Sequence, residues 1–203
     1  MAQRKGTCSS DPAMKLLSVV LLALSLVSTC AAVPAFPGAE GFGANATGGR
    51  GGEVYIVTNL NDSGSGSFRD AVSKSNRIVV FAVGGVINIS SRIVVSSKIT
   101  IAGQTAPGQG ITIYGNGLSY SAASDTITRY IRFRMGKGGD SGKDAISIAN
   151  GENIFLTILA VSWGRDETFS INDDVSGVTI SDSIIATRTA ITHSCGGLIQ
   201  ERS

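Results

Sequence analysis

Residues 144–180 read DAISIANGENIFLTILAVSWGRDETFSINDDVSGVTI, and within this stretch the chain repeats itself. Asp144–Ile148 (DAISI) resembles Glu167–Ile171 (ETFSI) at an offset of 23 residues, and Asn153–Leu156 (NIFL) resembles Gly177–Ile180 (GVTI) at an offset of 24. A period of roughly 20–25 residues with several short strands per repeat is typical of a solenoid. The stretch therefore predicts a β-solenoid in which these segments stack on neighbouring coils.

Coils of a β-solenoid lie about 4.8 Å apart, so inward side chains at equivalent positions pack on one another. The inward side chains expected to stack into a core column are Ile146, Ile148, Phe169 and Ile171. Extended toward the N-terminus, the same period aligns Ile131–Phe133 with the segment that begins at Ile154, again at an offset of 23 residues.

The rest of the chain after residue 32 consists of short apolar runs separated by Gly, Asn, Asp and Ser, without a sustained helical period. These runs are Val54–Val57, Ile78–Phe81, Val86–Ile89, Ile93–Val95, Ile99–Ile101, Ile111–Tyr114, Tyr130–Phe133, Ala145–Ile148, Ile154–Leu156, Thr168–Ile171 and Val178–Ile180. A β-sandwich is the alternative, but it requires hairpin turns, and Asn-Gly steps occur only at Asn116 and Asn150. An all-β solenoid is the favoured fold class.

Carboxylates gather where the two repeats align. If the offset of 23 is one coil, Asp144 lies beside Glu167 on the next coil, and Asp166 is adjacent. Like charges about 5 Å apart repel, so such an arrangement requires a counter-charge. A hard cation with oxygen ligands such as Ca²⁺ meets this need. The alternatives are that Arg165 or Lys143 neutralises the acids, or that their side chains diverge into solvent.

The N-terminus has the pattern of a secretory signal peptide, with Lys15, an apolar run over Leu16–Val27 and small residues up to Ala32. The run is shorter than the roughly 20 residues that span a bilayer, which disfavours a membrane anchor. We therefore expect residues 1–32 to be a leader with its start at Met14, residues 33–203 to form the mature domain, and the protein to be extracellular.

The mature part of the chain is close to neutral. Without residues 1–32, the 17 basic and 15 acidic residues fall to 14 of each, which disfavours nucleic acid as a partner. Cys195 is the one cysteine left, so the domain has no internal disulfide. Three Asn-x-Ser/Thr triplets make Asn45, Asn61 and Asn88 candidate N-glycosylation sites.

Several aromatic residues and one histidine remain as candidates for binding. Trp163 and the tyrosines at 114, 120 and 130 could stack on sugar rings, although isolated aromatics in a β protein more often pack in the structure. His193 is the single histidine, so neither a histidine triad nor a transition-metal site is expected.

Seven ordered motifs between about residues 34 and 200 resemble the pectate lyase family of secreted polysaccharide lyases. They are Ala35–Gly43 (AFPGAEGFG), Gly48–Gly52 (GGRGG), Gly64–Arg69 (GSGSFR), Ile99–Gly108 (ITIAGQTAPG), Tyr130–Arg134 (YIRFR), Val161–Thr168 (VSWGRDET) and His193–Ile199 (HSCGGLI). The resemblance implies a right-handed parallel β-helix, a calcium cofactor and β-elimination on polygalacturonate or pectin. It also implies that Asp144 and Asp166 are calcium ligands, with Glu167 as a third, and that His193 lines the substrate groove. We expect a monomer that needs no membrane partner.

The chain also departs from that family. The family's catalytic arginine lies in an Arg-x-Pro motif on the coil after the position of His193, and no Arg-x-Pro occurs in the 203 residues. The resemblance therefore implies an N-terminal portion, a solenoid incomplete at its C-terminal end, with the catalytic arginine beyond Ser203. A non-catalytic pectin-binding solenoid is one alternative, and a polygalacturonase, which would need paired acids, is another.

Overall fold

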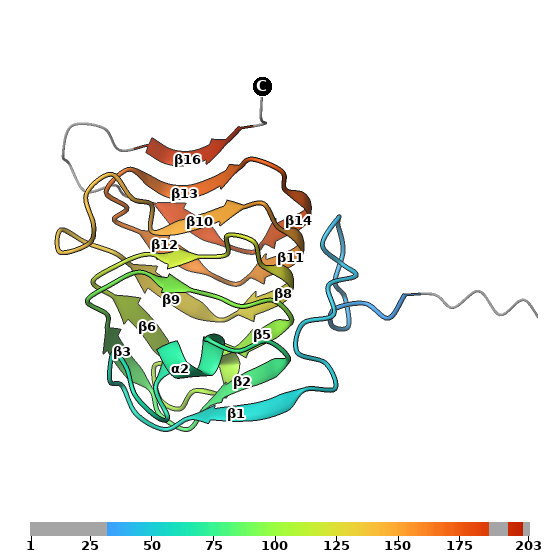
Figure 1. The fold of residues 1–203 in the computed structure, drawn as a ribbon, viewed down its shortest axis with the longest axis horizontal. Helices are drawn as coiled ribbons and strands as arrows, with labels where there is room; N and C mark the ends of the chain where they lie inside the picture. Colours follow the sequence, from blue (N-terminus) through green and yellow to red (C-terminus); the bar gives the residue numbers. More distant parts are fainter. Residues whose placement is uncertain (1–31, 187–194, 201–203) are drawn as a thin grey trace, which may run out of the picture. The chain divides into compact units, whose positions relative to one another are not determined.

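The computed structural model describes residues 32–186 and 195–200, which form strands and very little helix. The first unit of the chain, Met1–Ala32, lies almost wholly outside the described residues, and the second unit is Val33–Ser203. The strands, labelled in Figure 1 where there is room, are β1 (Glu53–Val57), β2 (Arg77–Phe81), β3 (Gly85–Asn88), β4 (Ile93–Val94), β5 (Ile99–Ala102), β6 (Ile111–Tyr114), β7 (Leu118–Ser119), β8 (Ser124–Arg129), β9 (Ile131–Arg134), β10 (Ile146–Ala149), β11 (Glu152–Thr157), β12 (Ala160–Ser162), β13 (Glu167–Asn172), β14 (Ser176–Ser181), β15 (Ile184–Ala186) and β16 (Cys195–Ile199).

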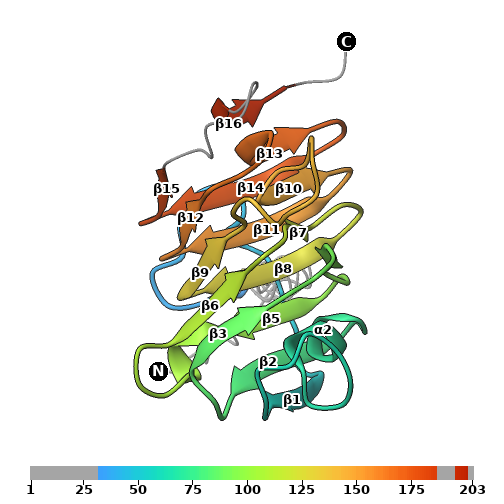
Figure 2. The same ribbon diagram turned by 90° about the vertical axis from the view of Figure 1, so that its left-hand side faces the viewer.

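Three sheets share the strands, and from β2 onward every third strand along the chain returns to the same sheet. Sheet A has the order β1-β2-β5-β8-β11-β14, sheet B β3-β6-β9-β12-β15 and sheet C β4-β7-β10-β13-β16. The strand pairs are parallel, which confirms the solenoid and excludes the sandwich, because a sandwich is built from antiparallel pairs. Figure 2 shows sheet B rising through the stack from β3 to β15.

The predicted register is confirmed for both repeats. Ile146 pairs with Phe169 in sheet C, and Ile154 pairs with Val178 in sheet A. The backward extension of the repeat is wrong, because Ile131–Phe133 lies in sheet B and Phe133 pairs with Val161 of β12. The true neighbour of β11 in sheet A is β8, a strand that the apolar pattern did not predict.

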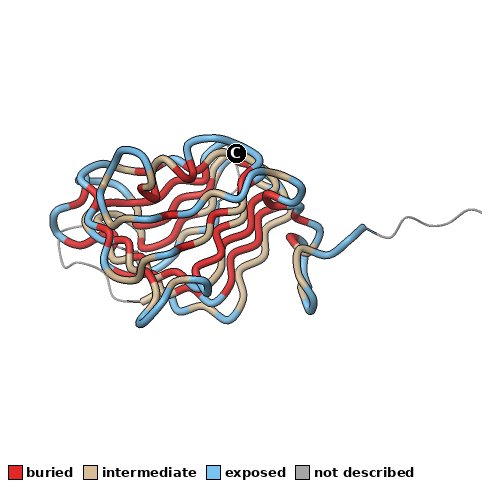
Figure 3. The backbone as a smooth tube through the Cα atoms, turned by 90° about the horizontal axis from the view of Figure 1, so that it is seen from below, coloured by how far each residue is buried: buried red, intermediate tan, exposed pale blue. Residues whose placement is uncertain are grey.

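The core runs along the inside of the three sheets, as the buried segments of successive strands in Figure 3 show. Ile146 and Ile148 are fully buried and Phe169 nearly so, as predicted, whereas Ile171, the fourth predicted member of the column, is only partly buried and packs against the core. Each such side chain contributes about 1.5–3 kcal/mol by leaving water. Ser147 alternates with Ile146 and Ile148 along β10, so it faces the outside of sheet C, where it lines an open groove.

The apolar runs did not include strands β7, β8, β12, β15 and β16, and two helical elements were also not predicted. A short helix, α2 (Phe68–Val72), begins at Ser67, whose side chain accepts a hydrogen bond from the Asp70 backbone amide. Its inner residues Phe68 and Val72 belong to the core. The 3-10 turn η1 (Gly103–Thr105) follows β5. Among the described residues, no helix is both long and apolar enough to span a membrane.

The segment before β1 lies against the outer face of sheet A. The Gly43 backbone amide donates to the Thr179 hydroxyl at 2.8 Å, and the Gly49 amide donates to the Thr100 hydroxyl at 2.9 Å. The Phe36 ring meets the Phe155 ring edge to face, with 4.9 Å between centroids. Ile127 and Phe155, two apolar residues on the outside of this sheet, are thus covered by the chain itself.

Candidate functional site

The repeated acids meet on the outer edge of sheet C. Asp144 stands two residues before β10, Glu167 is the first residue of β13 on the next coil, and Asp166 precedes it. One carboxylate oxygen from each of the three lies within 4.8 Å of the others. The structure thus brings together the three acids that the 23-residue offset placed side by side.

The Asp144 carboxylate is held by the coil above it. Its Oδ1 accepts a hydrogen bond from the Glu167 backbone amide at 3.1 Å, and its Oδ2 accepts one from the Ser170 hydroxyl. Burial, together with a hydrogen bond and negative charge from Asp144 and charge from Asp166, raises the pKa of Glu167 to about 7. The repulsion expected from the sequence is therefore present in the structure.

Neutralisation by a neighbouring base, one alternative left open by the sequence, is not what the structure shows. Arg165 donates from Nη1 to the Gly139 carbonyl at 2.6 Å and not to a carboxylate. Within residues 32–186 and 195–200, the ion pairs are Arg69 with Asp62 and Arg77 with Glu53, and neither involves the three acids.

Arg92 reaches the acidic site from two coils away. Its Nη2 donates to the Asp144 carbonyl at 2.8 Å and its Nη1 to the Ser147 hydroxyl at 2.7 Å, while its Nε is buried without a hydrogen-bond partner. A side chain at Gly117 would come within 3.1 Å of Nη2, so glycine leaves room for the guanidinium. Burial lowers the pKa of Arg92, and the charges of Asp144 and Asp140 oppose that shift.

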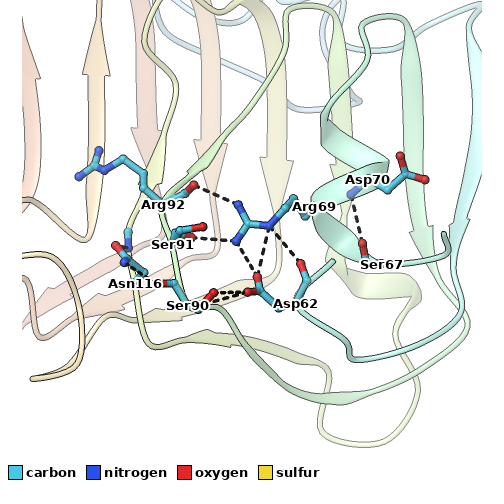
Figure 4. A network of polar contacts seen from close by, with 9 residues as sticks. Asp62, Ser67, Arg69, Asp70, Ser90, Ser91, Arg92 and Asn116 are labelled. Carbon is cyan, nitrogen blue, oxygen red and sulfur yellow. Dashed lines mark hydrogen bonds and ion pairs between the residues drawn. The ribbon is translucent and has the colours of Figure 1, made fainter. Parts of the chain in front are cut away.

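A polar network fixes the backbone from which Arg92 extends (Figure 4). Arg69 of α2 forms an ion pair with Asp62 at 2.6 Å and donates to the carbonyls of Ser91 and Arg92. Asp62 also accepts hydrogen bonds from the amide and hydroxyl of Ser90. Burial alone would raise the pKa of Asp62, but the hydrogen bonds from Ser90 and Arg69 outweigh it and lower the pKa.

An open groove of about 560 Å³ runs over sheet C at this point. The polar residues that line it are Arg92, Ser119, Ser121, Lys143, Asp144, Ser147, Asp166, Glu167 and Asn172. Carboxylates from two coils converge at one end of the groove, and hard divalent cations prefer such oxygen ligands. The donor set therefore fits Ca²⁺, with Asp144, Asp166 and Glu167 as the residues that would hold it.

Sequence reasoning missed Ser170 and Arg92. Ser170 had a signal, because it pairs with Ser147 in the aligned repeat and carries the same side chain. Arg92 had none, since 52 residues separate it from Asp144 and no local pattern links them.

The remaining predicted site residues have varied outcomes. His193 lies outside the described residues. Asn45, Asn61 and Asn88 are all exposed, as glycan attachment requires. Of the aromatic candidates, Tyr120 is fully buried and hydrogen-bonded to Thr128. The tyrosines at 114 and 130 are each 40% exposed, and Trp163 is 38% exposed.

The fold and this site define a parallel β-solenoid with an acidic groove that suits a hard cation. No family model matches the chain. The chain is 66% identical over 187 residues to a protein of Aspergillus flavus named "Probable pectate lyase C", a match that covers 92% of this chain and 44% of that protein. A protein of the same name from Aspergillus fumigatus is 65% identical over 188 residues, with the same coverage.

A plant protein and a solved structure are more distantly similar to the chain. "Putative pectate lyase 17" of Arabidopsis thaliana is 26% identical over 166 residues, covering 71% of this chain and 42% of that protein. The crystal structure of jun a 1, the major allergen from cedar pollen, superposes with a TM-score of 0.58 at 22% identity, over 69% of this chain and 46% of that one, and shows the shared fold. The resemblance to pectate lyases inferred from the motifs is thus confirmed. The chain spans about 44% of the length of the Aspergillus relatives that it matches.

Proposed function

We propose that this chain is the N-terminal portion of a secreted, calcium-dependent pectate lyase that cleaves polygalacturonate by β-elimination. The observation that carries the proposal is the convergence of Asp144, Asp166 and Glu167 within 4.8 Å at the groove. The 65–66% identity to proteins named pectate lyase C supports the substrate class. Residues 1–32 act as the leader in this proposal, and the mature protein works as an extracellular monomer.

The residues at the groove would prepare the substrate for elimination. Calcium, when bound, stabilises the negative charge that develops on the uronate as the C5 proton leaves. Asp144, Asp166 and Glu167 would hold the cation, while Arg92 and Ser170 hold Asp144 in place. His193, which lies outside the described residues, is proposed to contact the polymer.

Proton removal from C5 needs a base, and we propose that an arginine outside these 203 residues supplies it. General-base catalysis contributes about 10²–10⁴-fold to such a step. The 203-residue chain should therefore bind polygalacturonate in a calcium-dependent way but release little unsaturated product. At alkaline pH hydroxide can take the proton instead, so slow elimination should appear.

The test measures ultraviolet absorbance of unsaturated oligogalacturonides at neutral and alkaline pH, with calcium and with a chelator. Asp166→Asn should abolish both calcium-dependent binding and the alkaline elimination. Glu152→Gln removes one exposed carboxylate of β11, a strand of sheet A, at a position that does not line the groove, and should change neither. Product with new reducing ends but no absorbance would indicate a hydrolase and overturn the proposal.

The alternative function is a non-catalytic pectin-binding solenoid, favoured by the absence of Arg-x-Pro. It predicts calcium-dependent binding with no elimination at any pH. The alkaline assay separates this alternative from the lyase.

A further inference from the structure

Two arginines stand side by side on the outer face of sheet B, away from the acidic groove. Arg132 and Arg134 alternate with the buried Ile131 and Phe133 along β9, so both guanidinium groups face outward. On neighbouring strands Arg132 is flanked by Thr112 and Ala160, and Arg134 by Tyr114 and Ser162. None of these four neighbours carries a charge.

Neutral acceptors hold both guanidinium groups. Arg132 donates from Nε to the Thr112 hydroxyl at 2.9 Å and from Nη2 to the Gln109 carbonyl. Arg134 donates from Nη1 to the carbonyls of Phe133 and Ala160. In the described part of the chain neither arginine forms an ion pair, although Asp182 lines the same cavity of about 430 Å³ as Arg132.

This arrangement leaves two positive charges without an ion-pair partner in the described part of the chain. Burial and the charge of Arg132 both lower the pKa of Arg134. The surroundings therefore disfavour the charged guanidinium group of Arg134, and a bound anion would offset this effect. Two fixed guanidinium forks have the geometry that binds carboxylates in a bidentate way. Because hydrogen bonds already order these side chains, little rotamer entropy is lost when an anion binds.

Aromatic rings flank Arg134 on both sides. Tyr114 is its neighbour in register on β6, and the Trp163 ring centroid lies 5.9 Å from the Arg134 guanidinium carbon. Both rings are about two-fifths exposed, whereas the aromatic residues of the core are buried. Exposed rings beside cations offer a flat apolar surface for a pyranose and a charge for its carboxylate.

We propose that Tyr114, Arg132, Arg134 and Trp163, here called the arginine face, form a second binding site for an anionic uronate polysaccharide. Trp163 directly follows β12, and Asp166 and Glu167 come three and four residues later, so one short loop joins the arginine face to the acidic site. A single polymer can therefore contact both, with the arginine face anchoring a segment distant from the site of chemistry. The identity of the polymer rests on the proposed function, whereas the existence of the binding site does not.

The test uses the whole chain with a chelator present, so that binding through calcium is removed. Polygalacturonate binding is measured by calorimetry and by the fluorescence of Trp163, the single tryptophan of the chain. Arg132→Gln with Arg134→Gln should weaken binding about tenfold or more and remove the fluorescence response. Lys74→Gln with Lys98→Gln makes the same change in net charge at exposed positions elsewhere and should weaken binding by less than about twofold.

Two further variants keep the test decisive. Arg132→Lys with Arg134→Lys retains the charge but not the forks, and should recover only part of the affinity. Asp166→Asn should leave calcium-free binding intact while it abolishes calcium-dependent binding, so failure of the proposed function and failure of this inference are distinguishable. Circular dichroism verifies that each variant folds.

Two results would overturn the inference. One is calcium-free binding that survives the double glutamine variant. The other is binding of dextran sulfate as tight as that of polygalacturonate with no competition from oligogalacturonides, which would show attraction to charge alone.

Discussion

At Glu167, burial and the carboxylates of Asp144 and Asp166 all raise the pKa, to about 7. In the unfolded chain this carboxyl group titrates at the ordinary value of 4.5. Without calcium the folded protein therefore binds the proton more tightly than the unfolded one does. The stability from this proton is complete below the unfolded pKa and is lost as pH rises through about 7.

We predict that, in a chelator, the melting temperature of the wild-type protein falls between about pH 5 and pH 8 relative to that of Glu167→Gln. Glutamine keeps the shape of the side chain but cannot ionise. A difference in pH dependence between the two proteins therefore reports the ionisation of Glu167 and not a change in packing. Thermal unfolding followed by circular dichroism across that range measures the difference. Parallel pH profiles for the two proteins would contradict the assignment of the proton to Glu167.

Arg92 allows a second prediction at the residue scale. Arg92→Lys keeps the charge but cannot donate at once to the Asp144 carbonyl and the Ser147 hydroxyl. We expect a several-fold loss of calcium affinity by calorimetry and a loss of about 1–3 kcal/mol in the free energy of unfolding. Arg50→Lys, at an exposed arginine that also donates to carbonyls, is the matched control. Unchanged calcium affinity in Arg92→Lys would show that Arg92 does not position Asp144.

The offsets between paired strands explain why the sequence repeat predicted the acidic site but did not predict contacts between more distant coils, such as that of Arg92. From β10 to β13 the offset is 23 residues, and from β11 to β14 it is 24, so equivalent residues of these coils are recognisable in sequence. Between β8 and β11 the offset is 28, because Ile127 pairs with Phe155. Solenoid coils tolerate insertions in their loops, so a fixed period fails wherever a loop lengthens. The same insertions hide contacts such as that of Arg92, which crosses two coils.

The loop between β12 and β13 gives a prediction at the element scale. A Cβ on Gly164 would lie 2.0 Å from the Glu167 carbonyl oxygen, which is backbone and cannot rotate away. Gly164→Ala should therefore displace the turn that presents Asp166 and Glu167, lowering calcium affinity about tenfold or more. Gly138→Ala, in the loop of the preceding coil, meets nothing nearer than 4.0 Å and is the control. Equal calcium affinities in the two alanine variants would contradict this role of the turn.

Across the whole molecule, the fold was more predictable than the polar contacts made between distant coils. Alternation of apolar residues within each run fixes which side chains face inward, and Ile146, Ile148 and Phe169 follow it. The arginine face could not be predicted, because it forms only when three neighbouring coils stack. Tyr114 on one neighbouring coil and Trp163 on the other lie beside Arg134, and no local sequence pattern links these residues.

The coils of a solenoid contact mainly their nearest neighbours, so stability resembles a sum of coil and interface terms. The acidic site lies at one such interface, since Asp144 belongs to one coil and Asp166 and Glu167 to the next. Calcium at about 100 times its dissociation constant would stabilise the folded state by about 2.7 kcal/mol. For a domain of this size, that corresponds to a rise of about 5–10 °C in melting temperature.

We predict that calcium raises the melting temperature of the wild-type protein and of Glu152→Gln, and leaves that of Asp166→Asn unchanged. Hydrogen exchange should locate the effect, because a ligand shared by two coils first suppresses their separation. Protection should increase most at β10 and β13, which the ligand joins, and least at β1 and β2 at the opposite end of the stack. A rise of equal size in Asp166→Asn, or protection spread evenly from β1 to β14, would show that calcium does not act through this interface.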